Sequence, residues 1–192
     1  MTSIRNPKSE IRASGGRRIS PGLAKRLKAV KLLVLDVDGI LTDGRMIYGP
    51  DGEHMAFHIL DGHGIKLALR SGLALAIISG RESSMVARRA RELGVEDVQQ
   101  RVLDKLPAFE ALLLRKGLVR SQVACMGDDL QDLPLLLRAG LAISVPGAVD
   151  EVRRAAHYVT RRPGGEGAVR EAIELLLKVQ GHWPAVMERY RR

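Results

Sequence analysis

Two aspartates one residue apart, Asp36 and Asp38, are the residues whose types and spacing most directly indicate chemistry. They follow the apolar run 32–35, which predicts a strand buried on both faces, as in a parallel sheet. Ligand sites of such sheets lie just beyond the carboxyl ends of the strands. Two carboxylates this close repel each other unless a cation or a shared proton offsets the repulsion. The pair therefore predicts a site for a hard metal ion with oxygen ligands, for which Mg²⁺ is the best candidate.

Three further groups of polar residues follow predicted strands or open a predicted helix. They are Ser79, Gly80 and Arg81; Lys105; and Asp128 and Asp129. Strand ends converge in a parallel sheet, so we expect these groups to share one crevice with the Asp36 pair.

Their residue types fit phosphoryl transfer. A carboxylate is a competent nucleophile toward phosphorus, and a second acid can protonate the leaving oxygen. Mg²⁺ held between the first strand and the Asp128 loop would neutralise charge. The Ser79 hydroxyl and the backbone N–H groups after it suit an anion, and Lys105 adds positive charge.

The elements that must position these residues alternate between strand and helix. This alternation predicts an α/β fold of Rossmann type, a parallel sheet with helices on both faces. We expect strands at 32–35, 73–79, 95–99, 122–126, 141–145 and 157–160, and helices at 21–29, 64–70, 82–93, 104–116, 130–138, 148–155 and 168–180. Residues 45–48 and 54–57 flank a Gly-Pro-Asp-Gly turn, which predicts a β-hairpin beyond the strand ends. We expect this hairpin to expose the apolar side chains of Met46, Ile47, Met55 and Phe57.

Composition limits the class of protein. The 192 residues predict one domain over 21–181, after a disordered basic arm at 1–20 and before a C-terminal tail at 182–192. Most of the net charge of +9 lies in residues 1–31, which hold nine Lys or Arg against one Glu. With aromatic residues at 3%, no base-stacking surface is expected, so we predict no nucleic-acid partner.

Membrane insertion and disulfide chemistry are also not expected. No apolar stretch reaches transmembrane length, and no signal-peptide pattern opens the sequence. The single cysteine, Cys125, lies in an apolar run and has no partner for an intramolecular disulfide. We therefore expect a soluble cytoplasmic protein.

Several motifs resemble the haloacid dehalogenase superfamily. The superfamily's four motifs are matched by Asp36-x-Asp38-Gly39, Ser79 after a buried strand, Lys105, and Gly127-Asp128-Asp129-x-x-Asp132. Longer stretches at 36–44, 57–64, 77–81 and 158–171 are similar to the family of 3-deoxy-D-manno-octulosonate (KDO) 8-phosphate phosphatases, which belongs to the capless branch. The likeness runs from about residue 25 to residue 181.

This resemblance implies an Mg²⁺-dependent phosphatase with Asp36 as nucleophile and Asp38 as general acid and base. It places Mg²⁺ on Asp36, the Asp38 backbone carbonyl and Asp128, and phosphate contacts on Ser79 and Lys105. It also implies a homotetramer whose hairpin, about 44–57, helps a neighbouring subunit to close the site, and a role in lipopolysaccharide precursor synthesis.

The family's sugar-contacting stretch corresponds to further positions of this sequence. Together with Asp38, Ser79, Gly80 and Lys105, the implied substrate contacts are His58, Ile59, Leu60, Asp61, Gly62, Lys66, Arg81, Arg89 and Asp129. Three of them depart from the family pattern: His58 and Leu60 stand where Asn and Arg are expected, and Lys66 replaces an Arg. The identity of the sugar acid is thereby left open, and a nine-carbon sugar acid phosphate is the alternative substrate.

Other interpretations of the same residues are weaker. A catalytically silent tetramerisation module would not need Asp36, Asp38 and Lys105 intact. A calcium loop of the EF-hand type that starts at Asp36 would need Asp or Asn at its fifth position and Gly at its sixth, where this sequence has Ile40 and Leu41. A phosphoacceptor receiver domain would place its acceptor in mid-chain. A cysteine phosphatase would need an Arg six residues after Cys125, and no P-loop pattern is present. His54 and His58 have zinc-like spacing but lie in the predicted hairpin.

Overall fold

The structure is a computed structural model that describes residues 19–191. The predicted basic arm lies mostly outside this range. A six-stranded parallel sheet in the order β5-β4-β1-β6-β7-β8 forms the centre, and a separate two-stranded antiparallel hairpin, β2-β3, accompanies it. The predicted α/β fold is confirmed.

The strands and helices alternate along the chain. The sheet strands are β1 (Leu32–Leu35), β4 (Ala74–Ile78), β5 (Asp97–Gln99), β6 (Val123–Met126), β7 (Leu141–Ser144) and β8 (Tyr158–Val159), and the hairpin strands are β2 (Ile47–Gly49) and β3 (Gly52–His54). The helices are α1 (Pro21–Ala29), α2 (Ile59–Arg70), α3 (Ser84–Leu93), α4 (Lys105–Lys116), α5 (Leu133–Leu136), α6 (Asp150–Ala155), α7 (Ala168–Val179) and α8 (Trp183–Arg189), with short 3-10 turns η2 (Arg120–Gln122) and η3 (Leu130–Asp132).

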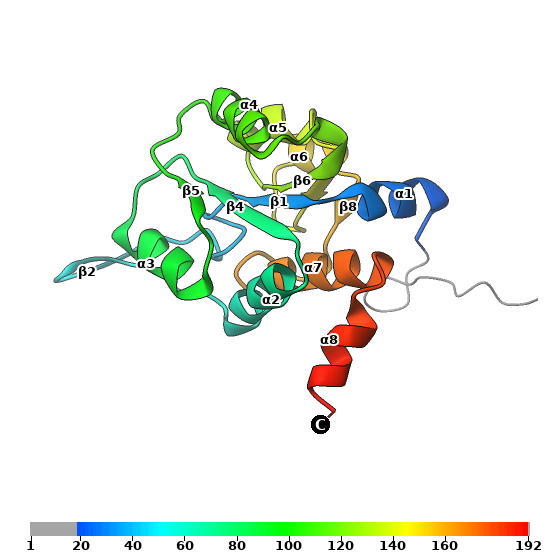
Figure 1. Cartoon of the computed structure of the whole chain (residues 1–192). Coiled ribbons are helices and arrows are strands. Elements are labelled where there is room, and N and C mark those ends of the chain that lie inside the picture. The colour runs from blue at the N-terminus through cyan, green and yellow to red at the C-terminus, as the bar shows by residue number, and fades with distance from the viewer. Residues whose placement is uncertain (1–18, 192) are drawn as a thin grey trace, which may run out of the picture.

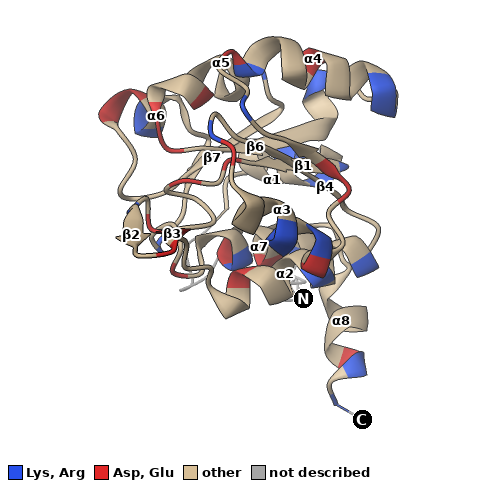
Figure 2. Cartoon of the chain, turned by 90° about the vertical axis from the view of Figure 1, so that its left-hand side faces the viewer, with Lys and Arg blue, Asp and Glu red and all other residues tan. Residues whose placement is uncertain are grey.

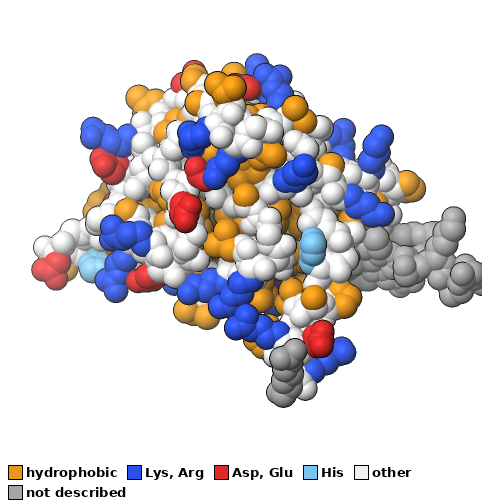
Figure 3. Space-filling model, in the orientation of Figure 1, with side chains coloured by type: hydrophobic (Ala, Val, Ile, Leu, Met, Phe, Trp, Pro, Cys, Tyr) orange, Lys and Arg blue, Asp and Glu red, His pale blue; other side chains and the backbone are white. Residues whose placement is uncertain are grey.

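Helices cover both faces of the sheet. In Figure 1, α4, α5 and α6 lie above the sheet and α2, α3 and α7 lie below it, while the hairpin projects at the left, beyond the carboxyl end of β1. Among residues 19–191, no helix is long and apolar enough to cross a membrane. Figure 3 shows basic and acidic side chains interspersed on this face, which therefore carries no uniform charge.

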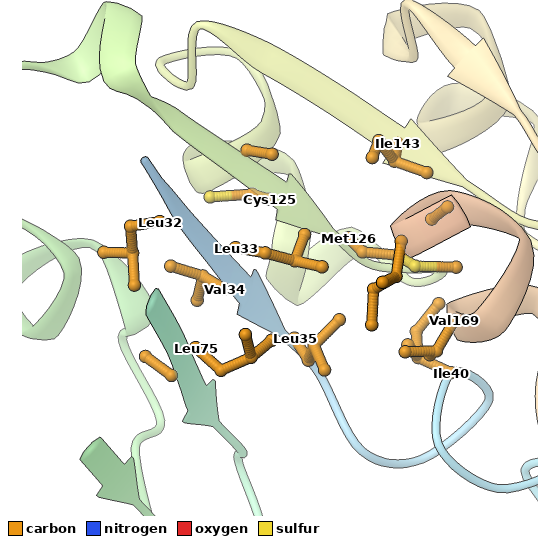
Figure 4. Close-up of a cluster of buried hydrophobic side chains, with 14 of the residues drawn as sticks. Leu32, Leu33, Val34, Leu35, Ile40, Leu75, Cys125, Met126, Ile143 and Val169 are labelled. Atoms are coloured by element: carbon orange, nitrogen blue, oxygen red, sulfur yellow. The ribbon is translucent and has the colours of Figure 1, made fainter. Parts of the chain in front are cut away.

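The central strand is buried because every residue of β1 is aliphatic and is packed on both faces (Figure 4). It pairs in parallel with β4 on one side and β6 on the other, with Leu35 opposite Ile77 and Met126. This register brings the carboxyl ends of the three strands to the same level. Cys125 lies in β6 with 2% of its surface exposed, and burial raises the pKa of its thiol, as expected of a core residue.

Helix α2 and the C-terminal segment differ clearly from the sequence expectation. Helix α2 begins at Ile59, five residues before the predicted start, with the His58 ring as its N-terminal cap, 3.2 Å from the Leu60 N–H. The segment predicted as a C-terminal tail contains the helix α8. The Tyr190 hydroxyl at its end lies 2.9 Å from His63 Nε2, so a hydrogen bond joins the end of this segment to α2.

The hairpin is also less exposed than the sequence predicts. Ile47 and Tyr48 of β2 are exposed, at 51% and 73% of their surfaces, and Met46 is 45% exposed. By contrast, Met55 and Phe57, which were expected to project into solvent, are partly buried against the core. The expectation for these two residues was wrong because the chain leaving β3 folds back toward α3, where the Arg89 guanidinium lies 6.0 Å from the Phe57 ring centre.

Candidate active site

A buried lysine and two aspartates form the centre of the site. Lys105 is the first residue of α4 and is 1% exposed. Its ammonium nitrogen lies 2.7 Å from Asp36 Oδ1 and 2.6 Å from Asp132 Oδ1. Asp36 directly follows β1, and its backbone N–H donates to Met126 of β6, so the strand pairing itself fixes the position of this carboxylate. The predicted convergence of Asp36 and Lys105 is confirmed by this geometry.

The loop after β6 brings the third carboxylate. Asp128 follows Gly127, and the other carboxylate oxygen of Asp132 accepts the backbone N–H groups of Asp128 and Asp129, at 3.0 and 3.3 Å. One carboxylate oxygen from each of Asp36, Asp128 and Asp132 lies within 4.8 Å of the others. Asp132 therefore both orients the lysine and shapes the loop, a role that the sequence analysis did not assign to it although its motif ends on this residue.

The three carboxylates carry more negative charge than Lys105 offsets. Asp36 Oδ2 and Asp128 Oδ1 are buried and have no hydrogen-bond partner in the described residues. Buried polar atoms without partners are rare and costly, so two such oxygens in one acidic cluster indicate a place where a cation can bind. A divalent cation with a preference for oxygen fits this cluster, and Asp36 and Asp128 are the residues that could hold it.

The pKa values of these acids reflect the same excess of charge. Burial, together with repulsion from Asp132, raises the pKa of Asp36 to about 7, although Lys105 opposes the shift. Burial and the charges of Asp132 and Asp129 raise the pKa of Asp128 to about 7. Burial alone would lower the pKa of Lys105, but Asp36 and Asp132 raise it above its ordinary value, so the lysine stays cationic.

Close backbone packing supports the cluster. Gly39 has φ of +81°, and a Cβ on it would lie 2.0 Å from Asp128 Oδ2, so only glycine fits beside this carboxylate. The buried Thr42 hydroxyl accepts the N–H groups of Gly39 and Gly44. Figure 2 views the molecule from the carboxyl ends of the strands, and acidic residues gather there among the loops beside β6 and the hairpin.

Asp38 lies outside the carboxylate cluster and is held by an arginine. The Arg81 Nε donates to Asp38 Oδ2 at 3.0 Å, and Arg81 Nη2 also makes a short contact with Glu53 of β3. Asp38 and Arg81 are only partly exposed, at 31% and 36% of their side chains. The side chain of Asp38 is therefore positioned apart from the cluster, at the more open side of the crevice.

Ser79 and Gly80 lie at the end of β4. Ser79 is 2% exposed, its N–H donates to Gln99, and its hydroxyl oxygen accepts the Arg81 N–H at 3.3 Å. A Cβ on Gly80 would lie 2.6 Å from the Gln131 amide oxygen, so the chain passes close to η3 at this point. Ser79 thus lies at the same edge of the sheet as Asp36, as the parallel strands require.

The expected sugar contacts on α2 have different surroundings from one another. Ile59 and Leu60 are exposed, at 74% and 42%, and His58 caps the helix. Asp61 is 1% exposed, and its two carboxylate oxygens accept the N–H groups of Gly167 and Arg170 at 3.1 and 2.7 Å. The Asp61 carboxylate therefore holds the start of α7, which is a structural role.

The remaining expected contacts lie on three elements. A Cβ on Gly62 would lie 2.2 Å from Arg89 Nη2, so α2 and α3 pack closely at this pair. Arg89 also pairs with Glu92 on its own helix. Lys66 is partly buried on α2. Asp129 accepts the Leu130 N–H at 2.7 Å and caps η3.

A glycine-rich loop before α7 borders the site. The Gly165 N–H donates to the Ile40 carbonyl at 3.0 Å, and a Cβ on Gly164 would lie 1.7 Å from the Gly39 carbonyl oxygen. A cavity of about 230 Å³ opens between the two loops and reaches Asp128. Glu166 and Arg45 also line this cavity, so the site extends toward the start of the hairpin.

Comparisons with known proteins agree with this geometry. A profile of the haloacid dehalogenase-like hydrolase family matches residues 97–173. A curated 3-deoxy-D-manno-octulosonate 8-phosphate phosphatase from Salmonella typhimurium is 42% identical over 164 residues, which cover 85% of this chain and 87% of the relative.

Two solved structures show the same likeness. The 3-deoxy-D-manno-octulosonate 8-phosphate phosphatase of Moraxella catarrhalis, in complex with a magnesium ion, a phosphate ion and KDO, is 44% identical with a TM-score of 0.85, over 87% of this chain and 97% of that one. A cobalt-bound form of the Haemophilus influenzae phosphatase is 36% identical with a TM-score of 0.78, over 81% and 92% of the two chains.

Proposed function

Because this chain belongs to the 3-deoxy-D-manno-octulosonate 8-phosphate phosphatase family of haloacid dehalogenase-like hydrolases, we propose that it hydrolyses this sugar acid phosphate to KDO and inorganic phosphate. The chain is a phosphomonoesterase, and the proposal concerns which phosphate ester it hydrolyses. The observation that supports it most is the buried cluster of Asp36, Asp128 and Lys105, which combines a nucleophile with a place for a divalent ion. The product would feed lipopolysaccharide synthesis in the cytoplasm.

The proposed chemistry begins at Asp36. A carboxylate oxygen of Asp36 attacks phosphorus while the bond from phosphorus to the sugar oxygen breaks, which leaves an aspartyl-phosphate. Lys105 holds Asp36 Oδ1 and so fixes the plane of the carboxylate for the attack. When bound at Asp36, Asp128 and the Asp38 backbone carbonyl, Mg²⁺ would neutralise charge on these carboxylates and on the phosphate.

Asp38 is the proposed general acid and base. It gives its proton to the departing sugar oxygen and then takes a proton from the water that attacks the aspartyl-phosphate, which releases phosphate and restores Asp36. Its separation from the carboxylate cluster supports this role, because it keeps the proton-transfer group on the open side. Ser79 and the following N–H groups, with Lys105, are the proposed phosphate contacts.

The sugar acid is the least constrained part of the proposal. Arg81 and Arg89 are the proposed cationic contacts beside the site, with Lys66, His58 and the exposed start of α2 as further candidates. Because His58, Leu60 and Lys66 depart from the family pattern, a panel of sugar acid phosphates tests the assignment directly. Turnover of the eight-carbon substrate with Mg²⁺ at a higher kcat/KM than the nine-carbon analogue is expected. The opposite order would move the assignment to the nine-carbon acid.

A homotetramer is part of the proposal. In the described residues the crevice has no separate lid domain, and a two-stranded hairpin is marginally stable on its own. Its exposed Met46, Ile47 and Tyr48 would gain from pairing with copies of the hairpin in a closed symmetric oligomer. We propose that the domain spans 21–181, with the hairpin as a flap over a neighbour's site. Light scattering of the wild type tests this, and a fully active monomer would refute it.

A further inference from the structure

Glu53 of the hairpin is a charged residue that the proposed chemistry does not use. It lies on β3, opposite Tyr48 of β2, and its side chain is only 23% exposed. Its carboxylate makes a short contact with Arg81 Nη2. An acid so placed has one clear partner, and that partner is itself bonded to Asp38.

The contacts form a chain from the hairpin to the proposed general acid. Arg81 donates through Nη2 to Glu53 and through Nε to Asp38 Oδ2, so two different nitrogens of one planar group are engaged. A third nitrogen, Nη1, lies 3.4 Å from Met46 Sδ, which also accepts the Tyr48 hydroxyl at 3.6 Å. Three of the guanidinium's nitrogens are thus fixed, two of them by the hairpin.

A guanidinium fixed at several points is rigid, because its donors lie in one plane with set directions. Without Glu53, Arg81 would keep only Asp38 and a weak sulfur contact, and its long side chain would regain rotamer freedom. The Asp38 carboxylate would then be less well aligned with the leaving oxygen. General acid catalysis depends strongly on such alignment.

We propose that Glu53 is a positioning residue for Asp38, acting through Arg81, so that the hairpin sets the geometry of proton transfer within its own subunit. This inference rests on the proposed function, in which Asp38 protonates the leaving oxygen. It assigns the hairpin a second role besides assembly. It also predicts a specific kinetic signature in kcat/KM, because in the first step, which forms the aspartyl-phosphate, only leaving groups that need a proton depend on Asp38.

The test compares two probe substrates in the intact enzyme with Mg²⁺. A primary alkyl phosphate has a basic leaving oxygen that must be protonated, whereas p-nitrophenyl phosphate releases a stabilised anion. Glu53→Ala should lower kcat/KM for the alkyl phosphate by about tenfold, part of the 10²- to 10⁴-fold that general acid catalysis contributes, and change the aryl value by less than about twofold. Glu53→Gln keeps an acceptor oxygen for Arg81 and should retain most of the alkyl activity.

Asp51→Ala is the matched control, since Asp51 is exposed in the turn of the same hairpin. It should leave both values unchanged. An equal loss on both substrates in Glu53→Ala, or no loss on either, would overturn the positioning role, because a hairpin that only supports the fold affects both alike. If the wild type with Mg²⁺ hydrolyses neither probe nor the sugar acid phosphate, the proposed function fails instead. Thermal unfolding of each variant separates a folding defect from the kinetic effect.

Discussion

In magnesium-free protein, the free energy of unfolding should fall as pH rises from about 5 to about 8, and Mg²⁺ should restore it most at the higher pH. The reason is that the folded-state pKa values of Asp36 and Asp128 are raised to about 7 by burial and by the neighbouring acids. Between the unfolded and folded pKa values, the folded state binds more protons than the unfolded state. Its stability is therefore complete below the unfolded pKa and is lost as pH rises through the folded pKa.

The magnitude follows from the size of the shift. Asp36 moves from 3.8 to about 7 and is 4% exposed. At about 1.4 kcal/mol for each unit, this corresponds to an upper limit of about 4 kcal/mol. Asp128 is more exposed, so solvent screens its charge and its added effect is smaller. We expect a total loss on the order of 3–4 kcal/mol across this range of pH, since the two acids titrate within one cluster.

Urea unfolding in chelator and in excess Mg²⁺, at both pH values, measures the effect. The double variant Asp36→Asn/Asp128→Asn removes both titrating groups and serves as the control. Comparison with this variant also removes the contribution of His63 and His157, which both proteins share. Burial lowers the pKa values of these histidines, so they destabilise the fold as pH falls, in the opposite sense to the two acids. If wild type and double variant show the same pH dependence in chelator, or if Mg²⁺ stabilises the wild type equally at both pH values, the charge argument is wrong.

Other predictions follow from single contacts. Asp36→Asn should stay folded and lose turnover, and a variant that keeps a tenth of the wild-type rate, about 1.4 kcal/mol of barrier, would refute the nucleophile. Lys105→Met should lower the metal-free free energy of unfolding by about 3–5 kcal/mol in urea titrations, because two buried carboxylates lose their counter-charge. Gly39→Ala should weaken Mg²⁺ binding measured by calorimetry, since its Cβ displaces the Asp128 carboxylate. Ile47→Glu should give species smaller than the wild type in light scattering, whereas an unchanged mass would argue against hairpin assembly.

The parts of the site that could be predicted from the sequence lie directly after buried strands. The aliphatic run of β1 and the length of β4 and β6 are local signals, and parallel pairing then dictates where Asp36, Ser79 and Asp128 meet. The ends of the helices were harder to predict from the sequence. The predicted start of α2 came late because Gly62 and Gly64 weaken the helical pattern, although these glycines let the helix pass close to Arg89 and Arg170.

The residues that support the site without belonging to it could not be predicted from the sequence, because their roles depend on contacts between distant segments. Asp61 was expected to contact the sugar only from the family resemblance, and the structure shows that its carboxylate binds the start of α7, more than a hundred residues later in the chain. That same start of α7 follows the loop in which Gly164 packs on the Gly39 carbonyl. Asp61 therefore supports the loop after Asp36 indirectly, by fixing the helix that follows Gly164. A sequence pattern shows only that these residues are acidic or glycine, and the packing of α7 against α2 decides which of them contact one another.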